Sequence, residues 1–205
     1  MKRISKLPFG YRKIYEIDMQ KDKKMFWLIQ LLGTLIMVVM AVPAHFYVPI
    51  TSLFDTSVRS EIYVIRLGVL IISLILYLIL HEAVHGIAMK MCGTKKVRYG
   101  FTGAYAFAAS DDYYAKGPYL FIALAPVVLW GVVLAVITYL VPTEWFWVIY
   151  FIQICNISGA VGDLFVTFRF ARFPKDILVR DYGVGMVVYG KKERSGFWSF
   201  FGSKK

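Results

Sequence analysis

Residues 67–85 read LGVLIISLILYLILHEAVH, an aliphatic run that ends in His81-Glu82-Ala83-Val84-His85. Two histidines four residues apart on a helix lie one turn apart on the same face, so both imidazoles can bind one zinc ion. Glu82, beside the first histidine, can reach a water on that metal and act as general base. The pattern arises by chance fairly often in soluble proteins. Inside a membrane helix, however, ionisable groups are costly and need a partner or a function.

The composition of the chain is that of a membrane protein. Of its 205 residues, 59% are hydrophobic and only 18% are charged, whereas about a quarter of the residues of a soluble domain are charged. The formal net charge is +11, and a basic chain can indicate nucleic-acid binding. Here the basic residues lie between the hydrophobic runs, so orientation in a bilayer explains them better. We therefore expect a lipid bilayer, and no nucleic acid, as a partner.

Four hydrophobic runs each approach the roughly 20 residues that a bilayer requires. They predict transmembrane helices at about residues 25–50, 62–89, 118–141 and 145–170. Eight of the lysines and arginines lie in residues 1–24, five in residues 90–117 and nine from Arg169 onward. Because cytoplasmic segments carry the excess of positive charge, both termini and residues 90–117 are expected in the cytoplasm.

The predicted fold class is a membrane all-α protein, a four-transmembrane-helix bundle in the cell membrane. A single domain is expected over residues 1–190, followed by a basic tail at residues 191–205. The tail is aromatic as well as basic, which suits contact with anionic headgroups.

The two histidines need a third ligand, because a catalytic zinc usually has three protein ligands and one water. Asp163 is the one other acidic residue well inside a predicted span. At 1.5 Å per residue, His85 and Asp163 lie roughly 8 and 9 Å from the cytoplasmic edge, at matching depth. Asp163 is therefore the predicted third ligand. The alternative is a structural aspartate paired with an arginine or a backbone amide.

Asn156 lies seven residues before Asp163, which places the two side chains nearly on one face of a continuous helix. Gly159 and Ala160 lie between them, and such small residues let another helix approach closely. The Asn156 amide could donate hydrogen bonds to a substrate carbonyl or to its oxyanion. Ordinary hydrogen bonding between helices is the equal alternative.

Three further features lie outside this group. Residues 97–109 predict two short strands around Thr102-Gly103, a hairpin between spans two and three. Its edge could bind an extended peptide by strand addition, or the hairpin could merely plug the bundle. Asp111 and Asp112 follow it and are expected in a solvated turn. His45, near the external end of the first span, is expected at the membrane interface rather than on a metal.

Several motifs together resemble a known family. They are HEAVH at residues 81–85, Asn156 with Gly162-Asp163-Leu164, and Pro174 with Asp181-Tyr-Gly. This set resembles the bacterial putative zincin peptidase family over roughly residues 7–190. The resemblance implies a membrane metallopeptidase.

A more distant resemblance is to the site-two intramembrane metalloproteases, which pair HExxH with a later Leu-Asp-Gly aspartate. It implies His81, His85 and Asp163 as metal ligands, Glu82 as base and Asn156 as their upstream asparagine. This chain departs from that pattern at the aspartate, where it reads Gly162-Asp163-Leu164.

The function predicted from the sequence is a membrane-embedded zinc metallopeptidase. Glu82 would activate the zinc-bound water, and a membrane protein or peptide would be the substrate. The active site would open toward the cytoplasm. The alternative is a non-enzymatic metal-binding or regulatory membrane protein that uses the same polar cluster.

Overall fold

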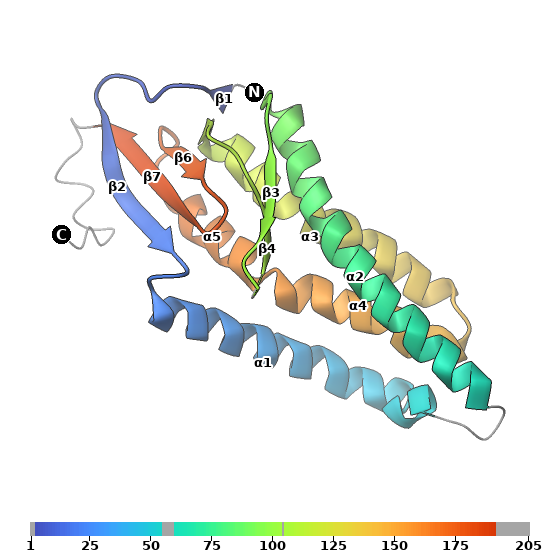
Figure 1. The fold of residues 1–205 in the computed structure, drawn as a ribbon. Helices are drawn as coiled ribbons and strands as arrows, with labels where there is room; N and C mark the ends of the chain where they lie inside the picture. The colour runs from blue at the N-terminus through green and yellow to red at the C-terminus, as the bar shows by residue number, and fades with distance from the viewer. Residues whose placement is uncertain (1–2, 55–59, 104, 192–205) are drawn as a thin grey trace. The chain divides into compact units, whose positions relative to one another are not determined.

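The computed structural model describes residues 3–54, 60–103 and 105–191, and helices form most of this part of the chain (Figure 1). The α-helices are α1 (Lys23–Tyr47), α2 (Ser60–Met91), α3 (Lys116–Leu140), α4 (Phe146–Gly159) and α5 (Val161–Ala171). Two short 3-10 helices, η1 (Ile50–Phe54) and η2 (Thr143–Trp145), lie between them. The strands are β1 (Arg3–Ile4), β2 (Tyr11–Asp18), β3 (Arg98–Phe101), β4 (Ala106–Ala109), β5 (Tyr113–Ala115), β6 (Leu178–Asp181) and β7 (Gly185–Lys191).

Among the described residues, four helical segments are long and apolar enough to cross a membrane. They are Lys23–Tyr47, Glu61–Met91, Lys116–Leu140 and Thr143–Ala171. Each agrees with a predicted span to within three residues, so the four predicted spans are confirmed as helices of membrane-crossing length and composition. The cytoplasmic placement of the termini remains a prediction. From residue 192 onward the predicted basic tail lies outside the described residues.

The fourth of these segments is not one continuous helix. The helix α4 ends at Gly159, and α5 begins at Val161 after Ala160, whose φ of −87° and ψ of 16° depart from the helical values. Glycine lowers helix stability by about 1 kcal/mol relative to alanine, and Gly159 and Gly162 lie on either side of this break. The prediction that Asn156 and Asp163 share a face of one continuous helix is therefore wrong, because the two residues lie on different helices.

A five-stranded antiparallel sheet corrects the expectation of an all-α fold with one hairpin. Its strand order is β1-β5-β6-β7-β2. The strand β2 pairs with β7 from Tyr11↔Lys191 to Asp18↔Gly185, and the two strands lie side by side in Figure 1. Because β2 and β7 come from opposite ends of the chain, local sequence patterns carry no information on their pairing. The strand β7 contains the β-prone run Gly185-Met-Val-Val-Tyr189.

The predicted hairpin between the second and third spans is confirmed. The strands β3 and β4 pair from Arg98↔Ala109 to Phe101↔Ala106. Gly103 in the connecting turn has a φ of +88°, a conformation that only glycine adopts at little cost.

The chain divides into two compact units. One comprises the described parts of residues 1–27, 82–125 and 164–205, and the other comprises residues 28–81 and 126–163. The first unit holds both sheets and is built around a core that includes Tyr114, Phe170 and Val188. The second unit is helical, and Trp147, Val148 and Ile154 are among its most buried apolar side chains. The prediction of one domain over residues 1–190 remains a prediction.

Candidate metal centre

The two histidines of the motif lie on the unbroken helix α2 and are both buried. His81 exposes 9% of its surface and His85 exposes 8%. Since α2 continues without interruption from Ser60 to Met91, the four-residue spacing places both imidazoles on one face, one turn apart. Glu82 follows His81 on the neighbouring face and is half-buried.

Asp163 owes its position to the break between α4 and α5. It lies in the first turn of α5, where the unpaired amides and the dipole of the helix stabilise a negative charge. Its Oδ2 atom lies 3.6 Å from Nε2 of His81, and its side chain is 29% exposed. The break thus turns a costly carboxylate in an apolar segment into one at a favourable helix end.

The structure brings the three predicted ligands together. One ligand atom from each of His81, His85 and Asp163 lies within 4.8 Å of the other two. Tetrahedral zinc with bonds of about 2.0–2.1 Å holds its nitrogen and oxygen ligands about 3.3 Å apart. The group is therefore close to the dimensions of a zinc site, and two imidazoles with a carboxylate are a donor set that zinc favours.

A relay of hydrogen bonds assigns the tautomer of His81. The Asn156 amide donates from Nδ2 to the carbonyl of Val127 at 3.2 Å, so its Oδ1 atom faces Tyr77 and accepts from that hydroxyl at 2.9 Å. The hydroxyl has one proton. Its 2.8 Å contact with Nδ1 of His81 therefore requires that Nδ1 donates. In neutral His81 the lone pair then lies on Nε2, the atom that faces Asp163.

The tautomer of His85 follows from a single contact. Its Nδ1 atom lies 2.9 Å from the carbonyl oxygen of Ile122, and a carbonyl can only accept a hydrogen bond. Nδ1 of His85 therefore carries a proton, and in the neutral ring Nε2 carries the lone pair. Both histidines of the motif thus present the same nitrogen as a ligand, each held by a hydrogen bond from the other nitrogen, as is usual for histidines on a metal.

Asn156 is fully buried, at 0% exposure, and lies in α4. Its contacts are with Tyr77 on α2 and with the backbone of α3. They support the interhelical alternative rather than the binding of substrate. Tyr77 was not singled out from the sequence. The available signal was a phenolic hydroxyl in an aliphatic run, one turn before His81.

The remaining polar residues noted in the sequence have structural partners. His45 lies outside the group and accepts a hydrogen bond from the amide of Ile50 through Nδ1, at 3.1 Å. Asp112 is not solvated as expected, because its side chain is only 12% exposed and pairs with Arg3 at 2.7 Å.

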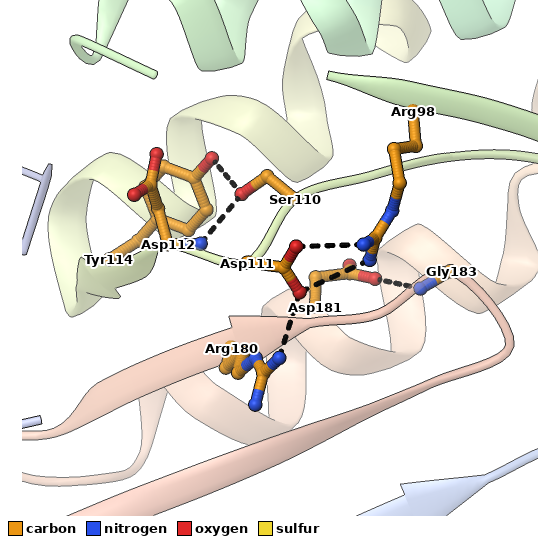
Figure 2. Close-up of polar contacts among 8 residues, drawn as sticks. All are labelled: Arg98, Ser110, Asp111, Asp112, Tyr114, Arg180, Asp181 and Gly183. Atoms are coloured by element: carbon orange, nitrogen blue, oxygen red, sulfur yellow. Dashed lines mark hydrogen bonds and ion pairs between the residues drawn. The ribbon is translucent and has the colours of Figure 1, made fainter. Parts of the chain in front are cut away.

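Asp111 is exposed but lies between two arginines, as Figure 2 shows. Arg98 from β3 and Arg180 from β6 bind its carboxylate at 2.7 and 2.8 Å. The hydrogen bond from Arg180, together with the charge of Arg98, lowers the pKa of this carboxyl. The two ion pairs of Asp111 therefore link the hairpin to the larger sheet. Neither Asp111 nor Asp112 belongs to the metal centre.

A comparison with known families matches the part of the chain that holds these residues. Residues 74–178 match the family described as "Putative zincin peptidase". They make up about half of the chain. They include the three predicted ligands and the residues whose hydrogen bonds hold His81 and His85. The chain belongs to the putative zincin peptidase family, a family whose description points to a zinc-dependent metallopeptidase.

The chain is also similar to an uncharacterized 24.7 kDa protein of Pyrococcus woesei. The two are 31% identical over 122 residues, which cover 57% of this chain and 53% of the relative. The chain thus spans about half the length of that protein. No solved structure matches the chain.

Proposed function

We propose that the protein is a membrane-embedded zinc metallopeptidase that cleaves membrane or membrane-associated proteins. The observation that carries the proposal is the common tautomer of the two histidines. Nδ1 of each is held by a hydrogen bond, which leaves Nε2 of each as the candidate ligand atom, and one ligand atom from each lies within 4.8 Å of one from Asp163. The family membership supports a peptidase rather than another use of the same ligands.

His81, His85 and Asp163 would hold the zinc ion. When bound, zinc would supply Lewis-acid polarisation of the scissile carbonyl and would lower the pKa of a water. Glu82 lies next to the ligand His81 and is only partly exposed, which suits a carboxylate that must approach water without being fully solvated. In the proposal it takes the proton of the attacking water and delivers it to the leaving amine.

The class of substrate follows from the surroundings. The proposed ligands lie in helical segments of membrane-crossing length and composition, so a substrate that shares the bilayer reaches them most directly. We expect an unwound segment of a membrane protein, since a peptide bond inside a helix is shielded by its own hydrogen bonds. The distribution of lysine and arginine supports access from the cytoplasmic side.

The test is a comparison of new protein N-termini in membranes of cells that produce wild type, Glu82→Gln or Glu61→Gln. The last variant makes the same substitution near the other end of α2. The zinc content of each purified protein is measured in parallel. We expect wild type and Glu61→Gln to generate the same new N-termini, and Glu82→Gln to bind zinc but generate none.

Equal cleavage by a zinc-loaded Glu82→Gln variant would contradict the assigned mechanism. Zinc binding by all three proteins without any new N-terminus would favour the non-enzymatic, metal-binding alternative.

A further inference from the structure

Pro126 lies inside α3, within the Lys116–Leu140 segment, and its side chain is fully buried. In a regular α-helix the carbonyl of residue 122 accepts a hydrogen bond from the amide of residue 126. Proline has no amide proton, and its ring also presses against the carbonyl four residues earlier. The sequence therefore removes the usual helical partner of the Ile122 carbonyl.

This same carbonyl binds a proposed metal ligand. Nδ1 of His85 donates to the oxygen of Ile122 at 2.9 Å. Ile122 exposes 2% of its surface and His85 exposes 8%, so water competes little for either group. The carbonyl that orients His85 is therefore the same carbonyl that loses its usual helical donor because residue 126 is a proline.

The orientation of an imidazole matters for metal binding. A hydrogen bond to the outer nitrogen fixes the tautomer and the ring plane, and substitution of such outer partners typically costs 10–100-fold in metal affinity. A backbone amide at residue 126 would compete for the oxygen of Ile122. It would also draw that carbonyl back toward the axis of α3 and away from His85.

We propose that Pro126 is a positioning residue of the metal centre, which keeps the Ile122 carbonyl available to hold His85 with its Nε2 atom toward the metal. This inference rests on the proposed function, because it presupposes that His85 binds a metal. Pro126 would act because it has no amide proton, and it would not contact the metal itself.

The proposal predicts that substitution of Pro126 weakens metal binding without lowering stability. Alanine and valine both restore the amide proton at residue 126, whereas only alanine leaves a smaller side chain in the buried site. Both Pro126→Ala and Pro126→Val should bind zinc 10–100-fold more weakly than wild type. Without metal, the restored amide should not lower the unfolding temperature of either variant below that of wild type. The reason is that proline is the least favourable residue in a helix interior.

The experiment uses the full chain purified in detergent. Zinc affinity is measured by competition with a chelator, and the absorption spectrum of the Co²⁺-loaded protein reports the ligand geometry. Thermal unfolding is followed without metal. Pro43→Ala is the matched control, since Pro43 also lies inside a helix, α1. We expect its zinc affinity and Co²⁺ spectrum to equal those of wild type.

The outcomes separate the inference from the function on which it rests. Wild-type zinc affinity in both Pro126 variants would overturn the inference alone. A loss in Pro126→Ala but not in Pro126→Val would also overturn it, because packing rather than the amide would then be responsible. Failure of wild type to bind either metal would overturn the proposed metal centre itself.

Discussion

Nε2 of His81 lies 3.6 Å from Oδ2 of Asp163, although the two residues belong to different helices. This distance is longer than a direct hydrogen bond. When His81 is neutral, the tautomer assigned to it turns a lone pair toward the carboxylate. Two electron-rich atoms that face one another in this way are stabilised by a cation between them, which is the electrostatic reason to expect a metal here.

Tyr77→Phe should weaken metal binding. The substitution removes the hydroxyl that binds both Nδ1 of His81 and Oδ1 of Asn156, and it keeps the ring. We expect a loss of about 10–100-fold in zinc affinity and of about 1–3 kcal/mol in the free energy of unfolding. Chelator competition and thermal unfolding measure the two. Tyr63→Phe, near the other end of α2, is the control and should change neither.

Asn156→Ala distinguishes the two roles considered for this amide. If Asn156 positions His81 through Tyr77, as its buried contacts support, zinc affinity should fall by about 10-fold or more. If the amide instead stabilises an oxyanion, zinc affinity should be unchanged, and cleavage should fall by about 100–1,000-fold. Measurement of zinc affinity alone decides between them, so no substrate is needed for this test.

Gly33→Ala should destabilise the helical unit. A Cβ atom at this position would lie 2.8 Å from the backbone oxygen of Ser158, and backbone moves aside less readily than a side chain. Such overpacking typically costs about 1–3 kcal/mol. Gly68→Ala is the matched control, because a Cβ there would meet nothing within 4 Å. It should leave the unfolding temperature unchanged or raise it slightly, and equal effects of the two variants would contradict the packing argument.

Acid should loosen the hairpin through Asp111. The pKa of this carboxyl is lowered in the folded chain, first by the hydrogen bond from Arg180 and also by Arg98. Its stabilising contribution is therefore fully present above the ordinary carboxyl value of about 4 and is lost as the pH falls through the lowered value. Hydrogen exchange of the β3 and β4 amides should be slower in wild type than in Asp111→Asn above this range. A difference that persists at the lowest pH would argue against the charge pair.

The four helical segments and the three converging residues could be predicted because their signals are local. Composition and run length mark a membrane-crossing helix wherever it lies in the chain. The four-residue spacing of His81 and His85 fixes their common face, and Asp163 was found by its depth in an apolar segment. The hairpin was also predictable, since its turn contains Gly103 between two short β-prone runs.

The larger sheet and the hydrogen-bond relays could not be predicted in the same way. The strand β2 reads as a charged segment, and its partner β7 lies at the other end of the chain. The break before Asp163 depends on two glycines that a membrane helix often tolerates. The partner of His85 is a backbone carbonyl, which carries no sequence signature except the proline four residues later.

The metal content of the purified full-length chain tests the central claim most directly. After zinc loading and desalting, elemental analysis should find about one zinc per wild-type chain and little in His85→Ala or Asp163→Ala. His45→Ala and Asp176→Ala, which replace the same residue types outside the proposed centre, should retain the wild-type content. Wild-type protein without zinc, or ligand variants that keep a full equivalent, would contradict a metal centre formed by His81, His85 and Asp163.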